Sequence, residues 1–428
     1  MADISLSHIT RLRGDVTIPG DKSISHRAAM LASIGNGISR IRNYSSAIDC
    51  RSTLNCMQSL GADIRHRGSE IEIHGKGQWS LREPEDVLDC GNSGTTMRLL
   101  CGLLAGQNFA TILTGDASLR RRPMDRIIKP LTQNGAEIYG RRTNRFAPLF
   151  IRGTELSDVS YELPVASSQV KSAVLLAGLY AGGAVQVIEP VRSRDHTERM
   201  LTFCGVEVQR KGAVITLGKN RQPAARNFQV PGDISSAAFM LALGLLVPDS
   251  RLTLHDVGIN STRTGLLSVL RQMGAAPELI NERLVANEPL ADIRVVSAPL
   301  KAVEIGGSLI PKLIDELPLI AVLATQAQGQ TIVRDALELR IKESDRIAAI
   351  VSELKKMGAA IEETEDGFIV EGPTKLYGAE CRSYDDHRIA MALSVAASIA
   401  DGESVIRDAD CVGISFPEFF NIIKSISS

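Results

Sequence analysis

An internal repeat limits the possible folds of this chain more than any other feature of its sequence. About every 70 residues, an apolar pattern with helical spacing ends at Gly-Ala or Gly-Val, and a strand, a turn and a second strand follow. Glycine commonly ends a helix, and alternating apolar residues mark a half-buried strand. The copies lie at residues 54–75, 127–153, 200–218, 266–286 and 350–372.

A second kind of helix lies between these copies. It begins in a small polar cluster and continues with almost no polar residue, and a helix that is apolar on every face is a buried helix. The polar clusters lie at 20–23, 91–96, 165–169, 232–236, 315–318 and 383–388. The repeating unit therefore combines one buried helix, one amphipathic helix and several strands, and it occurs about six times.

The two ends of the chain share one incomplete repeat in this interpretation. Residues 416–423 resemble the amphipathic helix of a sixth unit without the strands that should follow it. We expect the N-terminal strands at 5–9 and 14–18 to complete that unit, which would bring the chain ends together.

Two Pro-Gly-Asp turns, at 19–21 and 231–233, indicate how the repeats divide into domains. Each turn precedes an apolar helix, although such turns are also common in ordinary loops. We interpret them as two crossings between domains, because 428 residues are too many for one core. The predicted domains are 21–231, and 1–20 together with 232–428, with three repeats in each.

Composition excludes several classes of protein. A net charge of −1 does not favour a nucleic-acid partner. The seven scattered cysteines form no Cys-x-x-Cys pair, which indicates reduced thiols in a cytoplasmic protein. We expect no signal peptide, no membrane span, no cofactor and no metal site, because the corresponding sequence patterns are missing.

Residues 16–27 look like a strand, a tight turn and the start of a helix. Ser23 or Ser25 is placed to cap that helix, whose first turn also carries Lys22 and Arg27. Unpaired N–H groups and a partial positive charge make such a helix start a suitable binding site for phosphate or carboxylate. The alternative is an ordinary capped helix whose Lys22 and Arg27 are only solvated.

Further cations cluster near the other helix starts. Each alone is accounted for as a solvated charge, but so many at the ends of elements in a near-neutral chain favour a small substrate with several negative charges. They are Arg98, Arg120, Arg121, Arg122, Lys171, Arg192, Arg194, Arg340, Lys342, Arg346 and Arg388.

Two acids have a possible catalytic role. Asp315 opens a buried helix, where a helix cap is the ordinary explanation. Glu343 lies between Lys342 and Arg346, where an ion pair within the helix is the alternative. In a cationic cleft, either carboxylate could move protons as a general acid or base.

Seven motifs in this order give the chain a family resemblance from end to end. It resembles the 5-enolpyruvylshikimate-3-phosphate synthases (3-phosphoshikimate 1-carboxyvinyltransferases), which implies an α/β fold of two domains, each of three βαβαββ units, with the active site in the interdomain cleft. The motifs are GDKSISHR (20–27), GNSGTTMR (91–98), RPM (122–124), SSQVKS (167–172), RIKESDR (340–346), DHRIAM (386–391) and SFPE (415–418).

The resemblance also implies roles for individual residues. Asp315, Glu343 and Lys22 would be catalytic. Shikimate 3-phosphate would be held by Lys22, Ser23, Arg27, Ser167, Ser168, Gln169, Ser193, Arg194, Asp315 and Lys342. Phosphoenolpyruvate would be held by Lys22, Asn92, Gly94, Arg122, Gln169, Arg346 and Arg388.

The implied reaction is addition–elimination through a tetrahedral intermediate, in a monomer without a metal or cofactor. Two positions depart from the family pattern: Ile414 stands where many relatives have lysine before Thr-Phe-Pro, and Glu338 where many have asparagine. Gly94 is the glycine that some glyphosate-tolerant relatives replace with alanine, so we expect glyphosate to inhibit in competition with phosphoenolpyruvate.

Two other readings stay open at this point. A UDP-N-acetylglucosamine enolpyruvyl transferase typically carries a reactive cysteine in the loop before its Arg-Pro, whereas residues 114–122 contain none. A non-catalytic scaffold that binds phosphometabolites is disfavoured, because Lys22, Asp315, Glu343 and Arg346 occur together.

Overall fold

The computed structural model describes residues 2–427, which form two compact units. The first unit comprises Gly20–Val230 and the short segment Leu284–Glu288. The second unit comprises the chain up to Pro19, Pro231–Arg283, and the chain from Pro289 onward. The predicted domains placed Leu284–Glu288 in the second domain together with the rest of 232–428. The domain boundaries stay a prediction.

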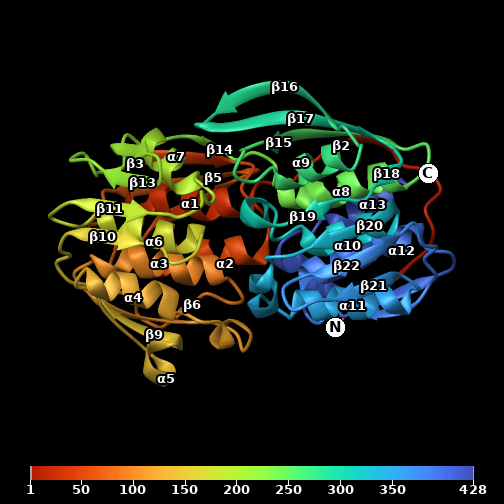
Figure 1. Cartoon of the computed structure of the whole chain (residues 1–428). Coiled ribbons are helices and arrows are strands. Elements are labelled where there is room, and N and C mark those ends of the chain that lie inside the picture. Colours follow the sequence, from red (N-terminus) through yellow and green to blue (C-terminus); the bar gives the residue numbers. More distant parts are fainter. Residues whose placement is uncertain (1, 428) are drawn as a thin grey trace. The chain divides into compact units, whose positions relative to one another are not determined.

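Three buried helices form the centre of the first unit, and Figure 1 shows them stacked in its middle. Their side chains are almost all apolar and covered beyond the first turn. Three further helices have one buried face each, as their periodicity predicts. The buried helices are α1 (Lys22–Ile34), α3 (Gly94–Ala105) and α6 (Ser168–Gly178), and the others are α2 (Ile48–Ser59), α4 (Asp125–Gln133) and α7 (His196–Phe203).

The first unit repeats one sheet topology three times. An edge strand pairs parallel to a central strand, which pairs antiparallel to the second strand of a hairpin. In spatial order the sheets are β14 (Phe228–Gln229), β3 (Asn36–Arg42), β5 (Glu70–Lys76) and β4 (Asp63–Arg67); β6 (Leu88–Asp89), β7 (Ala110–Thr114), β9 (Phe146–Arg152) and β8 (Glu137–Gly140); and β10 (Val159–Glu162), β11 (Val185–Ile188), β13 (Val214–Leu217) and β12 (Val208–Lys211). The short helices η1 (Leu119–Arg121) and α5 (Arg141–Asn144) lie in its loops.

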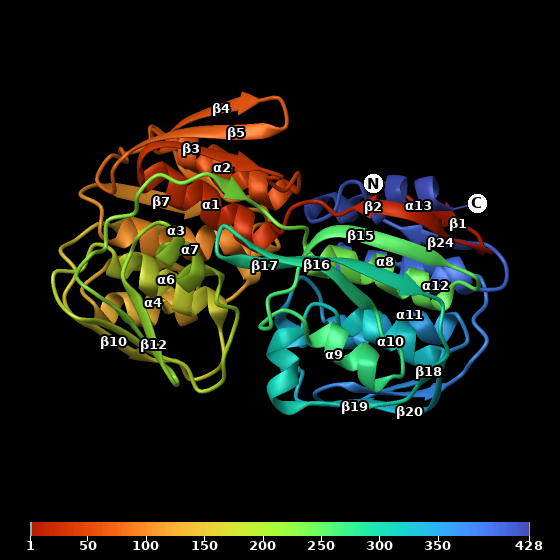
Figure 2. The same ribbon diagram turned by 90° about the horizontal axis from the view of Figure 1, so that it is seen from above.

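The second unit uses the same plan. Figure 2 shows its buried helices between β15 on one side and β20 on the other. Its buried helices are α8 (Ile234–Leu246), α10 (Leu317–Thr325) and α12 (His387–Ile399), and its one-sided helices are α9 (Gly265–Gln272), α11 (Arg346–Lys356) and α13 (Phe419–Ile426).

The sheets of the second unit include strands from both ends of the chain. In spatial order they are β16 (Glu278–Val285), β17 (Glu288–Val296), β15 (Arg251–Gly258) and β2 (Arg13–Thr17); β18 (Leu300–Lys301), β20 (Ala327–Val333), β22 (Phe368–Gly372) and β21 (Ala360–Glu363), with β19 (Glu304–Ile305) beside β20; and β1 (Ile4–Leu6), β24 (Ser404–Arg407) and β23 (Glu380–Arg382). Its short 3₁₀ helices are η2 (Gly307–Lys312), η3 (Leu337–Ile341) and η4 (Ala409–Ile414).

The N-terminal strands divide between two repeats. β1 pairs antiparallel to β24 and completes the sixth repeat as expected. The prediction that residues 14–18 also belong there is wrong, because β2 pairs parallel to β15 of the fourth repeat. β2 is the strand directly before the Pro19 turn, and β14, before the Pro231 turn, has the same place beside β3. The α/β fold of six repeats is confirmed.

None of the helices within residues 2–427 is long and apolar enough to cross a membrane.

Close approach of α3 and α6 depends on a glycine. A Cβ atom built on Gly102 would lie 2.1 Å from the carbonyl oxygen of Ala173 in α6, far inside van der Waals contact. By contrast, a Cβ on Gly182, in the loop after α6, meets nothing within 4 Å.

We predict that Gly102→Ala lowers the free energy of unfolding by about 1–3 kcal/mol, because the two helices must move apart. This loss outweighs the gain of about 1 kcal/mol in helix propensity. Urea unfolding of Gly102→Ala, Gly182→Ala and the wild type measures the change in the free energy of unfolding. A Gly102→Ala variant as stable as Gly182→Ala would contradict the close packing.

Candidate active site

Side-chain caps fix the starts of the three buried helices in the first unit. Asp21 accepts the N–H of Ile24 at 2.8 Å, and Ser93 accepts that of Thr96 at 3.1 Å. Ser167 begins α6 in the same way. The prediction that Ser23 or Ser25 caps α1 is wrong, because the turn places the carboxylate of Asp21 one residue before the helix. Ser23 and Ser168 lie in the first turns of α1 and α6 and are partly exposed.

Lys22 and Arg27 both belong to helix α1, but their side chains lie in different environments. The Lys22 ammonium is partly exposed and lies 2.9 Å from Oδ2 of Asp49 at the start of α2. Arg27 is buried and donates to the hydroxyls of Thr197 (2.6 Å) and Ser172 (2.8 Å). It therefore ties α1 to α7 and α6. Burial lowers the pKa of the Arg27 guanidinium to about 10, so it remains charged at neutral pH.

A second arginine joins the starts of α3 and α6. Arg98 donates to Oε1 of Gln169 at 2.5 Å, and the Gln169 amide donates to Thr95 at 3.0 Å. A Cβ atom on Gly94 would lie 3.2 Å from one nitrogen of Arg98 and 3.5 Å from one of Arg122. Gly94 therefore lies where two guanidinium groups approach the helix start.

Asn92 orients Arg122. Its side-chain oxygen accepts from Arg122 at 2.6 Å, and its backbone oxygen accepts at 3.3 Å. The Asn92 amide in turn donates to Asp116 at 2.7 Å. Arg122 is buried except for a small part of its surface, and this bracing fixes its plane.

The loop before α7 is held by a buried charge network. Lys171 is fully buried, with its ammonium 2.7 Å from Glu198 and 3.1 Å from Glu189. The hydroxyl of Ser193 donates to Glu189 at 2.8 Å. Arg194 follows in the same loop and lies near enough to Arg27 to help lower its pKa.

In the second unit, one buried arginine donates hydrogen bonds to three carboxylates. Arg346, at the start of α11, donates to Asp386 at 2.8 Å, to Glu343 at 2.6 Å and to Asp315 at 3.3 Å. Burial alone would lower the pKa of Arg346, but the charges of Asp386, Glu343 and Asp315 raise it above its ordinary value. Both candidate acids, Asp315 and Glu343, therefore form ion pairs with the same arginine. Asp386 also caps α12.

Arg388 in the first turn of α12 is held from α8. It donates to the backbone oxygen of Ser235 at 3.1 Å, and its guanidinium lies 5.9 Å from the ring centre of Phe239. Lys342 is more exposed, 4.0 Å from Glu338. Arg340 instead binds the turn between β21 and β22 through the backbone oxygens of Thr364 and Glu365.

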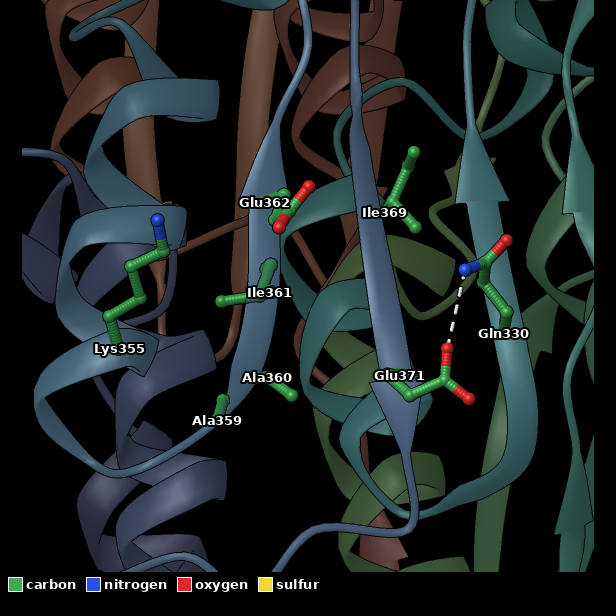
Figure 3. Close-up of a pocket in the computed structure, with 8 residues that line it drawn as sticks. All are labelled: Gln330, Lys355, Ala359, Ala360, Ile361, Glu362, Ile369 and Glu371. Atoms are coloured by element: carbon green, nitrogen blue, oxygen red, sulfur yellow. Dashed lines mark hydrogen bonds between the residues drawn. The ribbon is translucent and has the colours of Figure 1, made fainter.

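A hollow of about 420 Å³ in the second unit lies away from these residues (Figure 3). Lys355 of α11 and residues of β20, β21 and β22 line it, and Gln330 donates to Glu371 at 3.3 Å. It contains none of the predicted site residues.

Within residues 2–427, no group of three or more His, Cys, Asp or Glu side chains is arranged to hold a metal ion. All seven cysteines are buried free thiols.

Comparison with known proteins identifies the family of this chain. The sequence model of EPSP synthase (3-phosphoshikimate 1-carboxyvinyltransferase) matches residues 6–423. A 3-phosphoshikimate 1-carboxyvinyltransferase of Thermodesulfovibrio yellowstonii is 53% identical over 418 residues, which cover 97% of each chain. One of Desulforamulus reducens is 48% identical over 425 residues, 99% of each chain. The chain belongs to the EPSP synthase family.

Two solved structures share the fold of this chain. The EPSP synthase of Acinetobacter baumannii superposes with a TM-score of 0.88 at 41% identity, over 99% of this chain and 98% of that one. The enolpyruvyl transferase NikO of Streptomyces tendae superposes with a TM-score of 0.79 over 99% of this chain and 96% of that one. At 16% identity, this second likeness shows the fold alone.

The structure groups the predicted EPSP synthase residues by unit. In the first unit, the starts of α1, α3 and α6 gather Lys22, Ser23, Arg27, Asn92, Gly94, Arg122, Ser167, Ser168 and Gln169, with Ser193 and Arg194 on the loop before α7. In the second unit, Asp315, Glu343, Arg346 and Arg388 gather at the starts of α10, α11 and α12, and Lys342 follows η3. Their roles toward substrates stay predictions. Of the two residues that depart from the family pattern, Ile414 ends η4 and Glu338 lies in η3.

Sequence reasoning missed the groups that hold these residues. Asp49, Thr197 and Glu316 stand outside the motif positions to which it assigned roles, and their partners are distant in sequence. A signal for Glu316 was present, since it directly follows Asp315 in an otherwise apolar segment.

We predict that Arg346→Leu lowers the free energy of unfolding by about 3–5 kcal/mol, because it leaves three carboxylates without their cation. Urea unfolding of the purified protein measures the loss. The matched control is Arg294→Leu, which removes the exposed partner of Glu278 and should change stability by less than about 1 kcal/mol. Equal effects of the two substitutions would contradict the role given to Arg346.

Proposed function

We propose that this protein transfers the enolpyruvyl group of phosphoenolpyruvate to the 5-hydroxyl of shikimate 3-phosphate and releases inorganic phosphate. One observation supports this most directly: both candidate proton carriers, Asp315 and Glu343, accept hydrogen bonds from the same buried arginine, Arg346. The same reaction gives the family its name.

The two substrates account for the cations. Shikimate 3-phosphate and phosphoenolpyruvate each carry a phosphate and a carboxylate. In the proposal, Lys22, Ser23, Arg27, Ser167, Ser168, Gln169, Ser193, Arg194, Asp315 and Lys342 hold the first substrate. Lys22, Asn92, Gly94, Arg122, Gln169, Arg346 and Arg388 hold the second. Fixed guanidinium groups and helix starts need little reorganisation as charge develops.

The chemistry proceeds in two steps. Asp315 takes the proton of the 5-hydroxyl as the oxygen attacks C2 of phosphoenolpyruvate, and Glu343 with Lys22 delivers a proton to the C3 methylene. The C2–O bond to phosphate then breaks while C3 returns a proton to Glu343, which restores the double bond, and the proton held by Asp315 leaves with the phosphate. Arg346 holds both carboxyl groups in place before the reaction.

Release of inorganic phosphate separates this proposal from its rivals. Phosphate should appear only when shikimate 3-phosphate and phosphoenolpyruvate are both present. Turnover with UDP-N-acetylglucosamine in place of shikimate 3-phosphate would instead support the sister transferase, and no turnover would support a binding scaffold.

We predict that Lys22→Ala lowers kcat by at least about 100-fold, because it removes a cation from the reacting groups. Stability should change by about 1 kcal/mol or less, since the Lys22 ammonium is partly exposed. The control is Lys129→Ala, whose exposed lysine pairs with Asp125 at 3.9 Å. Retained turnover in folded Lys22→Ala would remove Lys22 from the mechanism.

We also predict that glyphosate inhibits in competition with phosphoenolpyruvate, because Gly94 leaves room beside Arg98 and Arg122. Initial rates at several concentrations of both compounds test this. An inhibition constant far above the KM for phosphoenolpyruvate would count against it, whereas Gly94→Ala should raise that constant by filling the space.

A further inference from the structure

Ser235 in the first turn of α8 connects three charged side chains of the second unit. Its hydroxyl donates to Oε1 of Glu316 and accepts from Arg263 at 2.7 Å. Its backbone oxygen accepts from Arg388 at 3.1 Å. Ser235 and Glu316 are both buried, so water does not compete for these bonds.

Glu316 does not perform the ordinary task of a residue at its position. It stands at the N-cap of α10, yet its side chain accepts no hydrogen bond from the first turn of that helix. Its carboxyl reaches Ser235 instead, and its Oε2 has no hydrogen-bond partner in the part of the chain that the structure describes. A buried carboxyl in this state is costly to retain, which points to a task other than capping.

The surroundings of Glu316 shift the pKa of its carboxyl in opposite directions. Burial raises the pKa of its carboxyl above the ordinary value; Arg263 and Arg388 oppose this shift, and Asp315 adds to it. Asp233 lies 3.3 Å from Arg263 and neutralises that cation. Arg388 is therefore the cation of this cluster that a substrate anion can use.

The position of Arg388 depends on α8. Both of its contacts to that helix, the backbone oxygen of Ser235 and the ring of Phe239, move with the first turns of α8. The Ser235 hydroxyl is fixed by Glu316 from α10 and by Arg263 from the loop before α9. Loss of the Glu316 acceptor would remove one of the two side-chain partners of the Ser235 hydroxyl and so loosen the residue whose backbone oxygen holds Arg388.

From this geometry we infer that Glu316 is a positioning residue for phosphoenolpyruvate: through Ser235, it holds Arg388 in place for the anion. The inference rests on the proposed function, in which Arg388 binds phosphoenolpyruvate. Glu316 itself touches neither substrate in this account.

The test compares Glu316→Ala, Ser235→Ala and the double variant in steady-state kinetics. Each single substitution should raise the KM for phosphoenolpyruvate about 5–10-fold and leave kcat and the KM for shikimate 3-phosphate within about twofold. The double variant should be no worse than the poorer single one, because both break the same link. Glu316→Gln keeps an acceptor for Ser235 and should stay within about twofold of the wild type.

Glu353→Ala is the matched control. Glu353 is equally buried in the same unit but binds Tyr384, Lys356 and the backbone of Arg382, so its loss should lower stability without a selective change in the KM for phosphoenolpyruvate. If Glu316→Ala does not fold, Ser235→Ala decides the matter by the same criterion.

An unchanged KM for phosphoenolpyruvate in the folded variants, or an equal rise in both KM values, overturns the inference while the proposed function stands. An inactive wild type overturns both.

Discussion

The polar first turns of the buried helices must find their hydrogen-bond partners in one another, and the arrangement of both units depends on this constraint. Each buried helix is apolar along its length, so its polar groups and its unpaired N–H groups are concentrated at one end. Packing three such helices brings these ends together. Arg27 and Arg98 join them in the first unit, and Arg346 and Ser235 join them in the second.

This constraint produces local positive charge in a chain that is almost neutral overall. The helix starts contribute partial charges, and guanidinium groups braced by amides add full ones. Arg122 is fixed by Asn92 in this way, whereas Arg346 is fixed by three acids that offset its charge. Bracing of this kind favours binding of small anions over general attraction for polyanions.

Periodicity made most of the fold predictable, because the features that carry it are local. Apolar spacing and Gly stops identified the helices and hairpins of five repeats, and the polar clusters identified the buried helices. The place of β2 was not predictable in this way, since its pairing with β15 joins segments more than 200 residues apart. Leu284–Glu288 contacts the first unit partly through the 2.8 Å hydrogen bond between the side chains of Glu288 and His196. No local sequence pattern predicts this contact.

The candidate site shows the same division. Motifs identified the residues that face the helix starts, such as Lys22 and Arg346. They did not identify the supporting groups, because Asp49, Thr197 and Glu316 acquire their importance only from neighbours brought close by folding. The choice of Asp21 over Ser23 or Ser25 as cap likewise depends on the turn geometry.

Calorimetric titration with shikimate 3-phosphate tests the central claim most directly, since the gathered helix starts are proposed to bind this anion. The account predicts saturable one-to-one binding that weakens as salt is added, with no comparable binding of UDP-N-acetylglucosamine. Absence of saturable binding, or equal binding of the two compounds, would contradict it.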